Sequence, residues 1–107
     1  MSSDFGFWKH GAGDPGDIFD NIAEGVTEGL RPDPAVLRFR DDVLARWPDI
    51  GDVLEPSEHD LEENPEDVTK YVLLTLSVRQ LNYIPELLAM AKAHGLVGYS
   101  GVADEPL

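Results

Sequence analysis

The amino-acid sequence predicts a single α+β domain over residues 1–107, built as a three-stranded sheet with helices packed on one face. Apolar residues recur at helical spacing in three segments, and three short β-prone segments lie before, between and after them. The expected order is strand, helix, helix, strand, helix, strand. The chain has 107 residues, so we expect one core, because each half alone would be too short to support its own.

The first strand and the first helix are predicted from the N-terminal third of the chain. Residues 5–8 alternate with both phenylalanines on one face, which is typical of a strand. After a glycine-rich turn, Asp14 can cap a helix whose first residue is Pro15. Apolar residues then recur at helical spacing between 18 and 30, so we expect this helix to reach about residue 28, with Gly29 as its stop.

The second helix is predicted between Asp33-Pro34, which repeats the same start signal, and Pro48, which cannot continue a helix. Its apolar stripe consists of Val36, Phe39, Val43 and Trp47. Arg40 and the neighbouring charged residues fall mostly outside that stripe. We expect Trp47 to be a core residue beneath the helix rather than a ligand-stacking residue.

The last third predicts a strand, a helix and a strand. Residues 71–77 are β-prone and nearly all apolar, as expected of an inner strand. A helix follows from about residue 82 to 94, with Pro85 in its first turn and Gly95 as its stop. A short strand at 97–99 should run parallel to the first of the two, in a right-handed crossover. Residues 100–107 are expected to be a polar tail.

The segment 49–69 is predicted to be an irregular acidic loop. It lacks apolar periodicity and contains Pro56, Asn64 and Pro65 as breaks. Its acidic residues from position 55 onward are Glu55, Glu58, Asp60, Glu62, Glu63, Glu66 and Asp67. Long loops in compact domains are usually functional or disordered, so this segment is the most informative polar feature of the sequence.

The composition limits the classes of partner. The formal net charge is −13, which should repel nucleic acid and anionic membranes and attract basic proteins. The alternative is that the charge only keeps the protein soluble. The sequence contains no cysteine, no export signal and no apolar run long enough to span a membrane, so we expect a cytoplasmic protein.

No catalytic, cofactor-binding or metal-binding residues are predicted. The sequence lacks a nucleophile elbow, a P-loop, a dinucleotide fingerprint and a zinc-protease motif. Of the three histidines, His94 suits the last turn of a helix and His10 borders a glycine turn. His59 lies in the acidic loop, which lacks the ligand spacing of a calcium loop.

Three segments together resemble a family of small, acidic, mostly uncharacterised actinobacterial α/β proteins. They are 4–8 (Asp-Phe-Gly-Phe-Trp), 44–49 (Leu-Ala-Arg-Trp-Pro-Asp) and 71–99, with Ala-Lys-Ala-His-Gly-Leu-Val-Gly-Tyr at its end. This chain departs from the family pattern at Ser100-Gly101, where an Asp-Pro pair is common. Some small acidic proteins of this type look like immunity proteins, and that resemblance implies a toxin-neutralising role.

The leading hypothesis is therefore a non-catalytic immunity-type inhibitor that neutralises a basic toxin or effector by occluding its active site. The acidic residues of 55–67 should meet the partner, with Trp8 and Tyr99 as candidate anchors. A nuclease is slightly favoured as the toxin because its substrate groove must be basic. Two alternatives remain: an enzyme-like domain that binds a metal or ligand through His59, Asp60 and neighbouring carboxylates, and a scaffold protein whose acidity only confers solubility.

Overall fold

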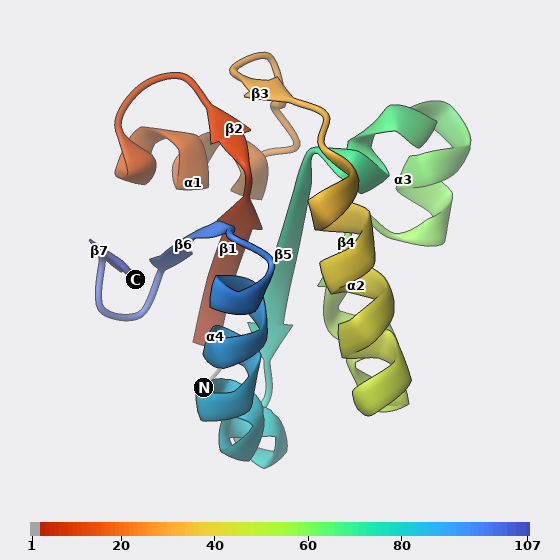
Figure 1. Cartoon of the computed structure of the whole chain (residues 1–107), viewed down its shortest axis with the longest axis vertical. Helices are drawn as coiled ribbons and strands as arrows, with labels where there is room; N and C mark the ends of the chain where they lie inside the picture. Colours follow the sequence, from red (N-terminus) through yellow and green to blue (C-terminus); the bar gives the residue numbers. More distant parts are fainter. Residues whose placement is uncertain (1–2) are drawn as a thin grey trace.

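The structure is a computed structural model that describes residues 3–107, and its centre is a five-stranded sheet (Figure 1). The strands of this sheet are β1 (Ser3–Trp8), β4 (Leu54–Glu55), β5 (Tyr71–Leu76), β6 (Val97–Ser100) and β7 (Glu105–Pro106), in the order β4-β5-β1-β6-β7. A separate ribbon pairs β2 (His10–Gly11) with β3 (Leu30–Arg31). The three predicted strands are present, and the α+β class is confirmed. Their number was underestimated, because two-residue strands leave no periodic pattern in a sequence.

Four α-helices and three 3-10 helices connect the strands of residues 3–107. They are α1 (Pro15–Ala23), α2 (Pro34–Arg46), α3 (Glu58–Glu63) and α4 (Ile84–Ala93), with the 3-10 helices η1 (Pro48–Val53), η2 (Pro65–Thr69) and η3 (Val78–Tyr83). The start of α2 is as predicted, because the Asp33 side chain accepts a hydrogen bond from the Ala35 N–H at 2.8 Å. Pro85 lies in the first turn of α4, and Gly95 follows that helix with φ +70°.

Strand β1 is the middle strand of the sheet, between β5 and β6. It pairs antiparallel with both, with Phe7 opposite Val72 on one side and Gly98 on the other. Strands β5 and β6 therefore run in the same direction, as the crossover through α4 requires. They are not neighbours, because the N-terminal strand lies between them.

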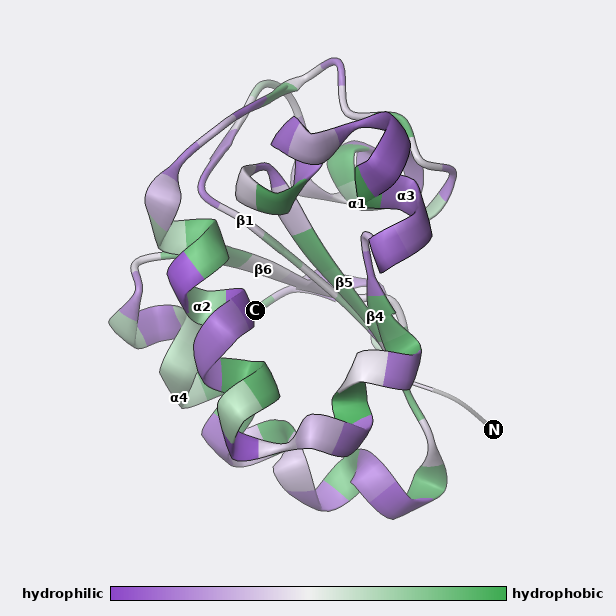
Figure 2. Cartoon of the chain, turned by 90° about the vertical axis from the view of Figure 1, so that its right-hand side faces the viewer, coloured by the Kyte–Doolittle hydropathy of each residue, from purple (hydrophilic) through white to green (hydrophobic). Residues whose placement is uncertain are grey.

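Helices cover both faces of the sheet, so the expected packing on one face is wrong. Figure 2 shows α2 and α4 on one side and α1 on the other. Alternate residues of β1 belong to different cores, with Phe7 under α2 and α4 and Trp8 under α1. Gly6 lets α1 approach closely, since a Cβ there would lie 2.9 Å from side-chain atoms of Phe19 and Ile22. The inner strand β5 is nearly all apolar because both of its faces are buried.

Helix α1 is shorter than predicted, and the chain leaves it at Gly25 rather than at Gly29. Gly25 has φ +78°, and its N–H donates to the Ile22 carbonyl. Val26, expected on the apolar face of the helix, is 39% exposed, whereas Leu30 is buried in β3. Two apolar residues at helical spacing beyond the glycine therefore imitated a longer helix.

The expected polar tail contains part of the sheet. Strand β7 pairs with β6, with Glu105 opposite Ser100, and the Leu107 N–H donates to the Gly98 carbonyl at 2.9 Å. The turn between them passes through Asp104 at φ 53°. Within residues 3–107, no helix combines the length and the apolar character needed to cross a membrane.

Candidate functional site

The acidic segment is ordered around helix α3, so its prediction as an irregular loop was wrong. Ser57 and Asp60 form a capping box: the Asp60 N–H donates to Ser57 Oγ at 3.2 Å, and the Ser57 N–H donates to Asp60 Oδ2 at 3.0 Å. These hydrogen bonds hold the pKa of the Asp60 carboxyl below its ordinary value. The Ser-x-x-Asp spacing is a recognised helix start signal, but no apolar periodicity follows it in this segment.

We define the acidic surface as Glu55, Glu58, Asp60, Glu62, Glu63 and Glu66, all of which are exposed. Helix α3, which carries most of them, lies on the opposite side of the molecule from β7 (Figure 1). Among residues 3–107, the one ion pair that involves this surface joins His59 Nδ1 to Glu62 Oε2 at 3.9 Å, and both side chains are exposed. The remaining carboxylates of the surface have no ion pair with any described residue.

Asp67 does not belong to this surface, although its sequence position suggested that it would. It is 7% exposed and lies 3.6 Å from Lys70 Nζ, and the Thr27 hydroxyl donates to Asp67 Oδ1 at 3.5 Å. The Thr27 contact joins η2 to the segment between α1 and β3. Asp67 therefore supports the fold rather than offering a charge to a partner.

Trp8 and Tyr99 are buried, with exposures of 2% and 6%, so neither offers an anchor to a partner in this conformation. Both lie in the core beneath α1, where the Tyr99 ring packs 5.1 Å from that of Phe19. The Tyr99 hydroxyl donates to Asp104 Oδ1 at 2.7 Å and so fastens the C-terminal turn. Both residues therefore pack in the core of the protein.

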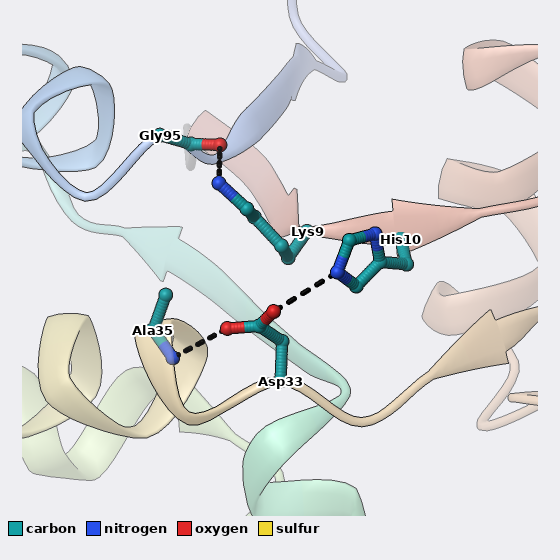
Figure 3. A network of polar contacts seen from close by, with 5 residues as sticks. All are labelled: Lys9, His10, Asp33, Ala35 and Gly95. Carbon is teal, nitrogen blue, oxygen red and sulfur yellow. Dashed lines mark hydrogen bonds and ion pairs between the residues drawn. The ribbon is translucent and has the colours of Figure 1, made fainter.

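Two histidines are paired with carboxylates that link separate elements. His94 Nε2 lies 2.7 Å from Asp42 Oδ2 and so joins the end of α4 to α2. His10 Nε2 lies 2.9 Å from Asp33 Oδ2, while Lys9 Nζ donates to the Gly95 carbonyl at 3.0 Å (Figure 3). These contacts hold the start of α2 and the end of α4 against Lys9 and His10, the two residues that follow β1.

His59 is the one histidine within the acidic segment. In the part of the chain described, 3–107, no three histidine or acidic side chains are grouped so as to hold a metal ion. His59 is exposed, and its Nδ1 faces Glu62 alone at ion-pair distance.

A cavity of about 470 Å³ opens beside the acidic surface. It is lined by residues of α2, η1, β4 and the start of α3: Arg40, Leu44, Gly51, Asp52, Leu54, Ser57, Glu58 and His59. Arg40 was expected mostly outside the apolar stripe of its helix, yet it is only 8% exposed. Burial lowers the pKa of its guanidinium, opposed by the nearby carboxylates of Asp41 and Glu58. No local sequence pattern predicts this cavity, because it forms only where four elements meet.

The phenol of Tyr71 is buried close to the acidic segment. Burial, with Asp67 and Glu55 next in effect, raises its pKa to about 12. The hydrogen bond to Asp104, followed by burial, raises the pKa of Tyr99 to about 12 as well. On the acidic surface itself, burial and then Asp60 raise the pKa of Glu55. Burial therefore favours the neutral forms of Tyr71 and Glu55 in the folded protein, and the hydrogen bond to Asp104 favours that of Tyr99.

We expect stability to fall as the pH rises from about 10, the ordinary pKa of an unfolded tyrosine, toward 12. A raised folded-state pKa stabilises the protein fully below the unfolded pKa, and that contribution is lost as the pH approaches the folded pKa. Urea unfolding at stepped pH between about 9 and 12 measures this. Tyr71→Phe should flatten the fall, since the remaining change then comes from other groups. An identical pH profile in the variant would show that folding does not raise the pKa of Tyr71.

No protein-family model, no curated protein sequence and no solved structure matches this chain.

Proposed function

We propose that the chain is a non-catalytic binding protein, and specifically an immunity-type inhibitor that occludes the active site of a basic toxin or effector with its acidic surface. The observation that supports this is the exposure of six carboxylates, five of them without an ion pair among residues 3–107. Free carboxylates gathered on one side produce a local negative potential that attracts a positively charged cleft.

The capping box strengthens this proposal, because it fixes the helix on which most of these charges are carried. A partner then pays less conformational entropy when the surface is immobilised on binding. The formal net charge of the whole chain, −13, adds to the long-range attraction. A nuclease is the favoured class of partner, since an enzyme that binds a polyanion presents a basic groove.

The test replaces Glu62, Glu63 and Glu66 together by glutamine. None of the three lines the cavity or supports the core, so the fold should be retained. Stopped-flow mixing with a basic partner, co-purified from the native cell, should show association slowed by about tenfold at low salt. The association rate of the variant should also depend less steeply on salt concentration.

The matched control replaces Asp20, Glu24 and Glu28 by their amides. These exposed residues lie on or after α1, on the other side of the molecule from α3 in Figure 1. Their replacement removes the same number of charges. The control should associate nearly as fast as the wild type. Equal slowing in both variants would mean that net charge alone steers association, and no slowing in the first would assign the acidity to solubility.

A further inference from the structure

The side chain of Arg40 is largely buried, and one nitrogen of its guanidinium is shielded without a hydrogen-bond partner. The residue is 8% exposed, and within residues 3–107 none of its side-chain nitrogens makes a hydrogen bond or an ion pair. Its Nη1 atom is completely shielded. Buried charged groups in folded proteins are almost always paired or hydrogen-bonded, because burying a charge without a partner costs several kilocalories per mole. This arginine therefore indicates a missing acceptor.

Arg40 also forms part of the wall of the cavity beside α3, so an acceptor has room to reach the exposed part of its guanidinium. Its planar fork offers parallel N–H donors, the arrangement that a carboxylate accepts with both oxygens. The other ionisable residues of the wall are Asp52, Glu58 and His59. Glu58 is close enough to Arg40 to act on its charge. The wall thus combines one cation with two carboxylates.

This combination discriminates between classes of ligand. A simple anion would meet Arg40 but also two carboxylates and a strongly negative protein, whereas a simple cation would meet the buried guanidinium. A molecule with both charges can satisfy both ends. Leu44 and Leu54 add apolar wall for an aliphatic portion, and about 470 Å³ is room enough for a small amino acid.

We propose that this cavity is a binding site for a small zwitterion of the amino-acid class, whose carboxylate accepts hydrogen bonds from Arg40 and whose ammonium group lies beside Glu58 and Asp52. The site does not depend on the proposed inhibitor function, since it requires no protein partner. It shares Glu58 with the acidic surface, so an occupied cavity would neutralise part of that surface.

The first test compares ligands on the full chain by calorimetry and by NMR titration of the ¹⁵N-labelled protein. L-leucine supplies both charges and an aliphatic group, isocaproate lacks the amine, and isopentylamine lacks the carboxylate. Glycine and ε-aminocaproate test a smaller zwitterion and a wider charge separation. We expect saturable binding of L-leucine or another of the zwitterions, and binding of each half-ligand about tenfold weaker or more. Isocaproate binding as tightly as L-leucine, or no binding of any zwitterion, overturns the proposal.

The second test uses variants with matched controls. Arg40→Met should weaken binding of the zwitterion by about tenfold or more, whereas Arg79→Met removes an exposed arginine and should change nothing. Glu58→Gln should weaken the zwitterion but not isocaproate, and Glu63→Gln, on the same helix outside the cavity, should leave both unchanged. Binding that survives Arg40→Met would overturn the proposal. If that variant does not fold, the two glutamate variants, together with isocaproate and isopentylamine, still test the proposal.

Discussion

Replacing Trp47 by alanine should lower the free energy of unfolding by about 3–5 kcal/mol, the usual cost of removing a buried aromatic side chain. Trp47 is 6% exposed and belongs to the core beneath α2 and α4. Its ring stacks on that of Tyr83, with centroids 4.7 Å apart and planes 13° from parallel, and the Arg46 guanidinium lies 5.4 Å from its centroid. The truncation therefore removes core packing, an aromatic stack and a cation–π contact together.

Urea unfolding measures this loss, and Trp47→Phe is the matched control. Phenylalanine keeps an aromatic ring in the core and should cost clearly less than alanine. Tyr83→Ala in both backgrounds would separate the stack from the rest, because residues in contact are coupled. A loss below about 1 kcal/mol for Trp47→Ala would contradict the burial of this side chain.

Trp47 also illustrates what the sequence predicts reliably in this fold. Helix α2 carries an N-cap, a first-turn proline, an apolar stripe and a terminating proline, and all four signals agree. Helix α4 and strand β5 were predicted for similar reasons. Local signals suffice where propensity, capping and burial point to the same element.

Helices were expected on one face of the sheet only, although the sequence of β1 indicates that both faces are covered. In β1, Gly6 and Trp8 alternate with Phe5 and Phe7, so neither face of the strand is polar. A strand of that kind is buried on both sides, and a second face needs a covering helix, here α1. The two-residue edge strands, in contrast, are defined by pairing with distant residues and have no local signature.

Of the candidate site, local sequence identifies the acidic residues but not the buried Arg40. Six of the seven predicted acidic residues are exposed, five of them on or near α3 and Glu55 on β4, whereas Asp67 is buried. Arg40 was overlooked because helical periodicity places it at the margin of the stripe. Only the approach of η1 and β4 encloses it. Burial of a polar residue by distant segments cannot be read from its own neighbours in the chain.

Replacing Arg40 by methionine should raise the free energy of unfolding, by about 1–4 kcal/mol, when no ligand is present. Methionine has a similar length and packs the aliphatic part of the site, while it removes a charge whose Nη1 atom has no hydrogen-bond partner among the described residues. Most substitutions of buried residues destabilise a protein. A higher free energy of unfolding for Arg40→Met would therefore show that the guanidinium destabilises the ligand-free fold.

Urea unfolding of the wild type, Arg40→Met and the exposed-site control Arg79→Met measures this effect, and the control should stay within about 0.5 kcal/mol of the wild type. A clearly lower free energy of unfolding for Arg40→Met would mean that water in the cavity hydrogen-bonds the guanidinium. The charge would then stabilise the folded protein without any ligand. With a zwitterionic ligand in excess the ranking should shift, because a ligand that binds only the folded wild type stabilises it by an amount that grows with the logarithm of the ligand concentration. A charge that destabilises the empty protein and stabilises the occupied one is what a binding residue, as opposed to a structural one, produces.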